Sequence, residues 1–296
     1  MTAEISRNIY WGRTHGWANL LEEHDLNLRV RIPREVRKYS WARRSLVEPG
    51  TARPVFVVGA QRSGTNMVTY GLDMSPEFQV FNEGNRRAFA NYRLRERAHV
   101  LDLVERSRHE YVAFKPLLDS HLVLGLLDGM STSNRARAVW IYREVRGRVR
   151  SELAKFGDSN LRVLLLRAKD PGLRHWQLND DLGLSEESES LLDSFDPATL
   201  TQADGAALFW LIRNRLVFEQ GLAGRDDVAV LSYDQLVASP GPEMRRLCDF
   251  LDFPYSPNLI RHIETRPPSR VPTSEVKPRI LELCDDLHGQ LDSLNS

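Results

Sequence analysis

The sequence predicts an α/β fold of three layers, in which helices cover both faces of a mostly parallel sheet. Short apolar runs typical of buried parallel strands alternate with helical patterns along the chain. The first of these runs leads directly into a glycine-containing loop and then a helix. A strand, loop and helix in this order are suited to binding a phosphate-like anion, because the loop amides and the helix dipole both favour negative charge.

Five apolar runs, rich in β-branched and aromatic residues, mark the expected strands. They are Val55–Val58, Phe78–Phe81, Tyr111–Phe114, Ala138–Tyr142 and Val228–Leu231. Helices are expected after the glycine loop and over residues 85–107, 121–127, 145–156, 201–220, 241–251 and 275–293. Ligands of parallel sheets bind at the carboxyl ends of the strands, so the functional site is expected at that edge.

Composition and charge exclude several classes of function. The formal net charge is zero, which argues against broad nucleic-acid binding. No apolar run is long enough to span a bilayer, and no secretory signal is visible. Cys248 and Cys284 lack metal-ligand spacing and are interpreted as core residues in a reducing compartment. We therefore expect a cytoplasmic protein without a transmembrane segment.

The loop from Gly59 to Asn66 gathers several groups that bind anions. Its two glycines allow close approach of the backbone, and its hydroxyl, amide and guanidinium side chains donate hydrogen bonds. It is not a Walker A motif, because Thr65 stands where that motif has lysine. A P-loop kinase or other nucleotide-dependent phosphotransferase remains an alternative, since the strand before Asp234 superficially resembles a Walker B strand. A binding module without chemistry is a second alternative.

The segment Pro54–Val68, PVFVVGAQRSGTNMV, resembles the 5′-phosphosulfate loop of sulfotransferases that use 3′-phosphoadenosine 5′-phosphosulfate (PAPS). Arg143 ends a strand and Ser151 follows eight residues later, which is similar to the 3′-phosphate site of that family. Leu231–Pro257 resembles a further strand–helix region of the family. The resemblance implies a fold like that of P-loop NTPases. The end of the chain lacks the glycine-rich stretch of the cytosolic branch, which favours the bacterial or carbohydrate-type branch.

The resemblance implies roles for the residues that would bind the donor. Arg62 is expected to contact the phosphosulfate oxygens and to stabilise the bridging oxygen as its bond breaks. Arg143 and Ser151 are expected to bind the 3′ phosphate, which distinguishes PAPS from ATP. The 5′-phosphate site is expected to consist of Ser63, Gly64, Thr65 and Asn66, with Gln61 in the same donor site. The product would be 3′-phosphoadenosine 5′-phosphate (PAP), and no metal is required.

The acceptor hydroxyl or amine needs a base. The segment Phe114–Leu117 lacks the histidine of the cytosolic branch, whereas carbohydrate-type enzymes often use a glutamate just after the second strand. Glu83 occupies this position and is the expected general base. Lys115, at the end of the next strand, is expected to hold the sulfuryl group or orient the base. The alternative for either residue is a solvated side chain at a strand end.

The chain length fits one large domain with additions. Residues 1–53 are expected to form an N-terminal arm or short helices packed on the core, and residues 54–296 the sulfotransferase domain. Residues 157–200 are irregular and acidic and are expected to form a lid or acceptor-binding insertion. The acceptor itself, a carbohydrate, lipid or small metabolite, is not identified by the sequence.

Overall fold

The computed structural model describes residues 28–130, 136–169, 183–265 and 275–295. Within them, five parallel strands form one sheet in the order β2-β5-β1-β6-β7. A separate antiparallel hairpin pairs β3 with β4. The parallel sheet confirms the predicted α/β class. The strands are β1 (Arg53–Gly59), β2 (Phe78–Phe81), β3 (Phe89–Ala90), β4 (Arg93–Leu94), β5 (Tyr111–Phe114), β6 (Arg137–Tyr142) and β7 (Val228–Ser232).

The central position of β1 explains where a ligand can bind. β1 pairs with β5 on one side and with β6 on the other. The chain first builds the β2–β5 side of the sheet and then crosses to the β6–β7 side. The winding therefore changes direction next to β1, and an open α/β sheet has its ligand crevice at the carboxyl edge of this point. The glycine loop follows β1 at this edge.

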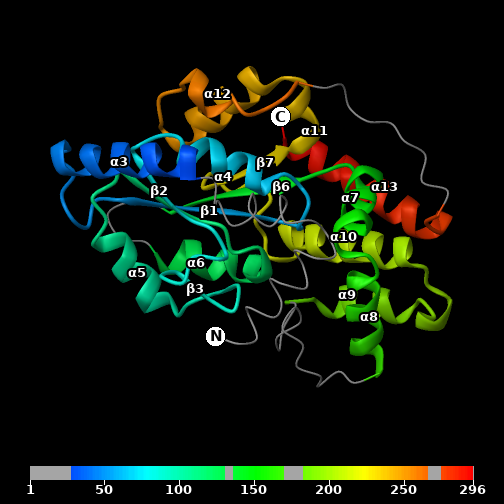
Figure 1. The fold of residues 1–296 in the computed structure, drawn as a ribbon. Coiled ribbons are helices and arrows are strands. Elements are labelled where there is room, and N and C mark those ends of the chain that lie inside the picture. Colours follow the sequence, from blue (N-terminus) through cyan, green and yellow to red (C-terminus); the bar gives the residue numbers. More distant parts are fainter. Residues whose placement is uncertain (1–27, 131–135, 170–182, 266–274, 296) are drawn as a thin grey trace.

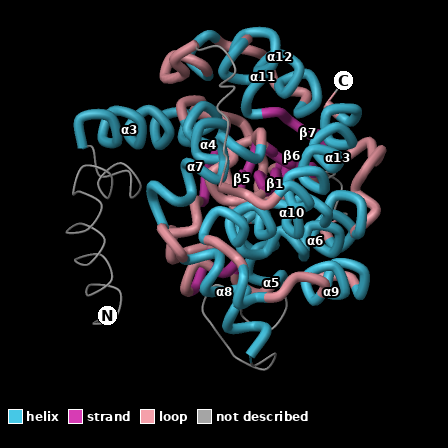
Figure 2. The backbone as a smooth tube through the Cα atoms, turned by 90° about the vertical axis from the view of Figure 1, so that its right-hand side faces the viewer, coloured by secondary structure: helices cyan, strands magenta, loops and turns pink. Residues whose placement is uncertain are grey.

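Helices cover both faces of the sheet (Figure 1). α4, α11 and α12 lie on one face with α3 beside them, and α5, α6 and α10 lie on the other; Figure 2 shows the strands enclosed between these layers. The α-helices are α3 (Leu28–Arg44), α4 (Thr65–Asp73), α5 (Arg97–Glu105), α6 (Val123–Gly129), α7 (Val145–Phe156), α8 (Ser159–Lys169), α9 (Glu186–Asp193), α10 (Gln202–Glu219), α11 (Tyr233–Ala238), α12 (Pro240–Leu251) and α13 (Pro278–Leu294). Short 3-10 helices are η1 (Leu117–Leu122), η2 (Pro197–Thr199) and η3 (Pro257–Leu259).

Side chains along β1 alternate between two hydrophobic clusters. Val55 and Val57 pack with residues of α4, α11 and α12. Phe56 and Val58 pack with residues of α6, α7, α10 and α13. Because both faces of the strand are covered, each of its positions must be apolar. This requirement explains the unbroken run Val55–Val58, from which the strand was predicted.

The helix α10 is buried on nearly all of its circumference, between the sheet and α7, α8 and α13. It begins at the predicted capping box: the Asp204 amide donates to the Thr201 hydroxyl at 3.0 Å, and the Thr201 amide donates to the Asp204 carboxylate at 2.9 Å. A helix so enclosed must satisfy its polar side chains inside the protein. Asn214, for example, accepts a hydrogen bond of 3.0 Å from the indole of Trp140 in β6.

The helix α3 buries two charged side chains and exposes apolar ones. Arg34 lies 2.7 Å from Asp73 at the end of α4, and Lys38 pairs with the same carboxylate. Burial lowers the pKa of Lys38, whereas Asp73 favours its charged form. Ile32 and Val36 are exposed on the opposite face. α3 therefore joins the core by buried ion pairs, together with the stacking of Trp41 on His109. The rest of the predicted N-terminal arm, residues 1–27, lies outside the described residues.

The strands and most of the late helices lie where the sequence predicts them. The expected helix over residues 85–107 is wrong in its first half, because the β3–β4 hairpin precedes α5. Asn91 and Tyr92 form its turn with positive φ angles of 51° and 66°, which interrupt a helix. Residues 121–127 begin as the end of η1 before α6. Within residues 157–200, the structure describes two α-helices, α8 and α9, which both contact α10.

The close contact between α8 and α10 gives a test of this packing. A Cβ atom added to Gly205 would lie 2.6 Å from the backbone Cα of Leu161. Gly205→Ala is therefore expected to destabilise the fold by about 1–3 kcal/mol through overpacking, measured by urea unfolding. Gly289→Ala is the matched control, because nothing lies within 4 Å of the added atom in α13, and alanine there is expected to stabilise the helix by up to about 1 kcal/mol. Equal effects of the two substitutions would contradict the packing described.

Candidate active site

Side chains predicted to act together lie along the carboxyl edge of the sheet. In the order of the strands, Glu83 follows β2, Lys115 follows β5, the glycine loop follows β1 and Arg143 follows β6. Tyr233 follows β7 at the end of this row. The strand order therefore places the loop between the expected acceptor residues on one side and the expected 3′-phosphate residues on the other.

The glycine loop has a tight backbone that leaves no room for larger residues. Gly59 has φ +130°, and a Cβ there would lie 2.1 Å from the Ile141 carbonyl oxygen. Gly64 has φ +93°, and its Cβ would lie 2.2 Å from the ring of Tyr233. Arg62 also adopts a positive φ, of 68°, which is costly for a residue with a side chain. The loop is thus held in one conformation by its neighbours.

The interior of the loop presents polar groups at the start of α4. Ser63 is fully buried, and its hydroxyl has no hydrogen-bond partner in the structure. Gly64 caps α4 without a side-chain hydrogen bond to the first amides of the helix. A buried hydroxyl without a partner costs free energy unless a ligand binds it. These features together suit an anion, which would also interact favourably with the positive end of the helix dipole.

The predicted 3′-phosphate residues contact the loop directly. The Arg62 Nε donates to the Ser151 hydroxyl at 3.1 Å. The Arg143 Nη1 donates to the Arg62 carbonyl at 3.4 Å, while its guanidinium stacks 4.5 Å from the ring centroid of Tyr233. The Nε of Arg143 is buried without a partner. Burial lowers the pKa of Arg143, and nearby Tyr233 and Asp234 oppose this effect. Arg62 thus links the two predicted halves of the donor site.

The predicted acceptor residues form a second group beside the loop. The Lys115 Nζ donates to the Asn66 amide oxygen and lies 3.5 Å from the Glu83 carboxylate. The side chains of Lys115 and Glu83 are 8% and 16% exposed, so neither is the solvated strand-end residue that was the alternative interpretation. Lys115 therefore connects the expected base to the loop. Arg62 does not belong to this group, because its side chain turns toward Ser151 on the other side of the loop.

A buried ion pair behind the loop was not predicted. Arg148 is fully buried and donates to the Gln61 carbonyl at 3.1 Å and to the Ala206 carbonyl of α10 at 2.7 Å. Its Nη2 lies 3.1 Å from Glu152. Burial lowers the pKa of Arg148 and raises that of Glu152, while each charge favours ionisation of the other. The signal in the sequence was the helical spacing Val145–Arg148–Val149–Glu152, which places this arginine on the inner face.

Polar side chains of α10 hold the loops after β5 and β6. The indole of Trp210 donates to the Arg143 carbonyl at 2.9 Å. Gln220 donates to the Ser120 carbonyl at 3.0 Å, and Arg213 donates to the Leu117 carbonyl. The sequence predicted α10 as a helix but assigned these three residues no role. Tyr233, which supports both Gly64 and Arg143, was likewise missed.

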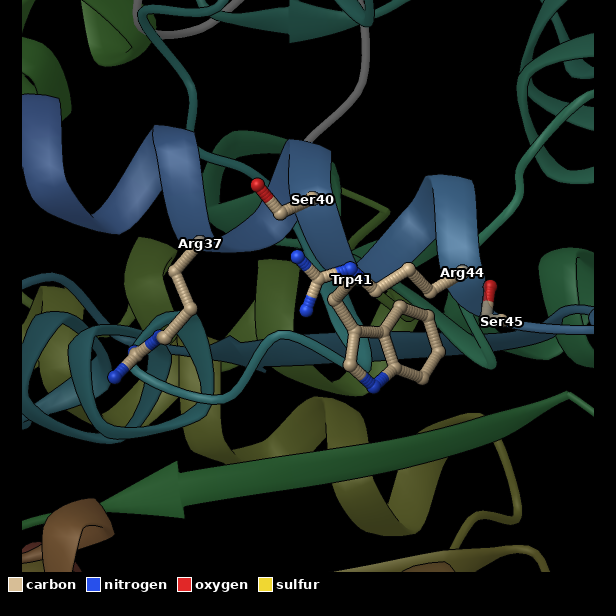
Figure 3. Close-up of a pocket in the computed structure, with 5 residues that line it drawn as sticks. All are labelled: Arg37, Ser40, Trp41, Arg44 and Ser45. Atoms are coloured by element: carbon tan, nitrogen blue, oxygen red, sulfur yellow. The ribbon is translucent and has the colours of Figure 1, made fainter.

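Two surface pockets lie away from this edge. One, of about 360 Å³, lies under α3 and is lined by Arg37, Ser40, Trp41, Arg44 and Ser45 (Figure 3). Arg37 there donates to the carbonyl of Met74, at the opposite end of α4 from the glycine loop. The other, of about 290 Å³, includes Gln79 and His109. Neither contains a predicted site residue, so the site is assigned from its side chains rather than from pocket size.

A family model described as a sulfotransferase domain matches residues 52–267. The chain belongs to the sulfotransferase domain family. The matched region contains the loop and both groups of side chains beside it, which confirms the resemblance found in the sequence. Comparison with curated proteins gives no match.

Similar solved structures are also sulfotransferases. One from Alicyclobacillus acidocaldarius is 17% identical with a TM-score of 0.45, over 82% of this chain and 96% of that one. One from Mycobacterium avium is 13% identical with a TM-score of 0.45, over 93% of this chain and 84% of that one. A sulfotransferase domain from the curacin biosynthetic pathway is 11% identical with a TM-score of 0.43, over 81% of this chain and 98% of that one.

The described part of this sulfotransferase has neither a membrane-spanning helix nor a cluster of metal-binding side chains. None of its helices is long and apolar enough to cross a membrane. Its His, Cys, Asp and Glu side chains form no group of three or more with the arrangement of a metal site. Both cysteines are buried and free, as expected for core residues. The predicted independence from metal stays a prediction.

The contribution of the buried Arg148–Glu152 ion pair to stability can be tested by substitution. Arg148→Met is expected to destabilise the fold by about 3–5 kcal/mol, because Glu152 keeps a buried charge without its partner. The double variant Arg148→Met/Glu152→Met is expected to recover most of that loss in thermal or urea unfolding, since no unpaired charge remains. A double variant as unstable as the single one would show that the ion pair is not the cause.

Proposed function

We propose that this sulfotransferase uses PAPS as donor and transfers its sulfuryl group to a hydroxyl or amine of an acceptor. The observation that carries the proposal is the contact of Arg62 with both Ser151 and Arg143. It joins a loop suited to a 5′ phosphosulfate to a basic group suited to a 3′ phosphate. A donor with phosphate groups at both positions fits this arrangement better than ATP, which has none at the 3′ position.

The residues present fit such a donor. The unpartnered hydroxyl of Ser63 and the close approach allowed by Gly64 would accommodate the 5′ phosphate and its sulfuryl group. The amides at the start of α4, beginning at Thr65, add further donors. Arg143, with a buried Nε that lacks a partner, would bind the 3′ phosphate together with Ser151. In this interpretation the ligand supplies the partners that these polar groups lack.

The chemistry assigned to the chain is a proton transfer and charge stabilisation. Glu83 would take the proton of the acceptor hydroxyl as the acceptor oxygen forms its bond to sulfur. The bond from sulfur to the 5′-phosphate oxygen breaks at the same time, and PAP leaves with the additional negative charge. Lys115, 3.5 Å from Glu83 and bonded to Asn66, would hold the sulfuryl oxygens and orient the base. Arg62 would stabilise the charge on the leaving phosphate.

We also propose that part of residues 157–200 borders the acceptor site. α8 and α9, within the predicted lid of residues 157–200, contact α10 beneath the site. Gly183 lies against the side chain of His121 in η1, close to the turn after β5. The contact between Gly183 and His121 supports a position of this part of the segment beside the turn after β5. The lid role stays a prediction.

Calorimetric titration with PAP tests the donor. Tight binding without magnesium is expected, and Arg143→Ala should weaken it about 10- to 100-fold, because a charged hydrogen bond to phosphate is worth about 1.5–3 kcal/mol. Arg106→Ala is the control, since Arg106 is 80% exposed and pairs with Asp102 on α5. Binding of ATP–Mg²⁺ without binding of PAP would replace this proposal by a kinase-like function.

Kinetics test the base. Glu83→Gln is expected to lower the rate of sulfuryl transfer from PAPS by about 10²- to 10⁴-fold. PAP affinity is expected to stay the same, because Glu83 follows β2, two positions from β1 in the sheet, and is not among the proposed phosphate-binding residues. Transfer would be followed by the release of PAP with a panel of sugar, lipid and phenolic hydroxyls. Glu282→Gln, an exposed glutamate of α13, is the control. An undiminished rate in Glu83→Gln would assign the base elsewhere.

A further inference from the structure

Apolar side chains gather on the exposed face of α3. Ile32, Val36 and Tyr39 are each more than half exposed, and Leu46, just beyond the helix, is almost fully exposed. The spacing of four and three residues places the first three in one stripe along the helix. Outside this segment, Leu122 is the one large hydrophobic side chain that the structure describes as exposed. Exposed apolar side chains that cluster in this way mark a surface for another molecule.

Arginines border this apolar stripe. Arg31, Arg37, Arg43 and Arg44 are exposed along the same helix, whereas Glu35 is its one acidic residue. The stripe therefore lies within a basic surface, which attracts anionic partners. Apolar side chains flanked by basic ones are also the composition of a helix that lies on a membrane surface.

A pocket suited to a phosphate group opens beside the stripe (Figure 3). Ser40 lies one helical turn after Val36 and lines this pocket of about 360 Å³ together with Arg37, Trp41, Arg44 and Ser45. The guanidinium and hydroxyl groups are donors that fit phosphate oxygens. Trp41 adds an indole, a side chain enriched at the boundary between lipid and water. The pocket thus offers a headgroup site next to an apolar face.

The basic surface continues from α3 to the end of α5. Trp41 stacks on His109 with ring centroids 5.8 Å apart, and the Ser45 hydroxyl donates to the Arg108 carbonyl at 3.4 Å. These contacts join the first pocket to the second one. The second pocket is lined by Arg87, Arg106, Arg108 and His109, and by a single acidic residue, Asp102. Positive charge therefore extends well beyond the helix.

Charge decides between an anionic membrane and a second copy of the chain. In a symmetric dimer the same patch meets itself. Two copies that met through this face would bring Arg31, Arg43 and Arg44 close to their own counterparts, and like charges across an interface are costly. A phospholipid surface instead supplies negative headgroups for the arginines and an apolar layer for the stripe.

We propose that α3, Leu46 and the pocket beside them dock the protein on membranes that contain anionic phospholipids. A headgroup phosphate would bind between Arg37 and Arg44, and the apolar stripe would enter the boundary between headgroups and acyl chains. Arg37 also holds the Met74 carbonyl, at the end of α4 opposite the glycine loop, so docking leaves that loop uncovered. The proposal is independent of the assignments of the donor and the base.

Flotation with vesicles tests the docking. The full chain is expected to bind vesicles of phosphatidylcholine mixed with phosphatidylglycerol, but not vesicles of phosphatidylcholine alone. Salt should release it, because salt screens the charges. Ile32→Ser/Val36→Ser should weaken binding about 10-fold or more, because less apolar area enters the lipid. Arg44→Gln should weaken it about 5-fold by removing one charge.

Two substitutions elsewhere are the matched controls. Leu122→Ser removes the exposed leucine of η1. Arg279→Gln removes an exposed arginine of α13, which lies on the other side of the molecule from α3 (Figure 1). Both variants should bind the anionic vesicles like the wild type. All of these substituted side chains are exposed, so the variants are expected to fold, and circular dichroism checks this.

A fluorescent label reports which part of the chain meets the lipid. Cys248 and Cys284 are buried, so Ile32→Cys adds one accessible thiol for an environment-sensitive dye, and Leu122→Cys is its control. With anionic vesicles, the emission of the label at position 32 is expected to shift to the blue, and that of the label at position 122 to stay unchanged. Emission at position 32 that is already blue-shifted without vesicles would show that another segment or a second copy covers this face, and would overturn the proposal.

The other outcomes are equally decisive. Failure of the folded wild-type chain to bind anionic vesicles, or equal binding to neutral ones, overturns the proposal. The same holds if the two control variants lose as much binding as the α3 variants, because the effect is then not specific to this face. Dimerisation that disappears in Ile32→Ser/Val36→Ser, measured by analytical ultracentrifugation without vesicles, would assign the face to a second copy instead.

Discussion

The fold and the site both depend on satisfying polar groups around one enclosed helix. α10 packs against the sheet, α7, α8 and α13, so its polar side chains have little access to water. They bond instead to the carbonyl groups where the chain leaves the strands: Trp210 to the end of β6, Arg213 and Gln220 to the turn after β5. The Ala206 carbonyl accepts from Arg148, which in turn donates to the glycine loop. One buried helix thereby sets the backbone positions of three loops at the active edge.

This arrangement explains how the loop after β1 can keep an unfavourable conformation. A positive φ at Arg62 and a buried hydroxyl at Ser63 without a partner both cost free energy. The surrounding contacts, from Tyr233 against Gly64 and from Arg148 to the Gln61 carbonyl, hold the loop regardless. Polar groups are thus arranged before a ligand arrives, which reduces the entropy lost on binding.

Much of the fold could be predicted because the responsible forces are local or periodic. Buried parallel strands require apolar residues at every position, so an apolar run such as Val55–Val58 predicts a strand. The Glu83–Lys115 pair could be anticipated because both residues end neighbouring strands. The first half of the expected helix at residues 85–107 could not be corrected from sequence, since the hairpin there depends on a contact between Leu94 and Asp119, 25 residues away. The burial of Arg148 could have been read from the helical spacing of Val145, Arg148, Val149 and Glu152. Arg213 was missed because α10 is buried on nearly all sides, so its sequence pattern does not distinguish one face from another.

The order of the strands affects how the substrate range of this fold can change during evolution. Groups suited to the donor phosphates follow β1 and β6, whereas the Glu83–Lys115 pair and the hairpin held by Asp119 follow β2 and β5 on the other side. The two halves touch where Lys115 reaches Asn66 and where the Ser120 hydroxyl donates to the Gly59 carbonyl. Under the assignment proposed above, substitutions in the β3–β4 hairpin would alter which molecule is accepted without disturbing the proposed nucleotide half. A lineage built on this sheet would then diversify its products while keeping a single donor.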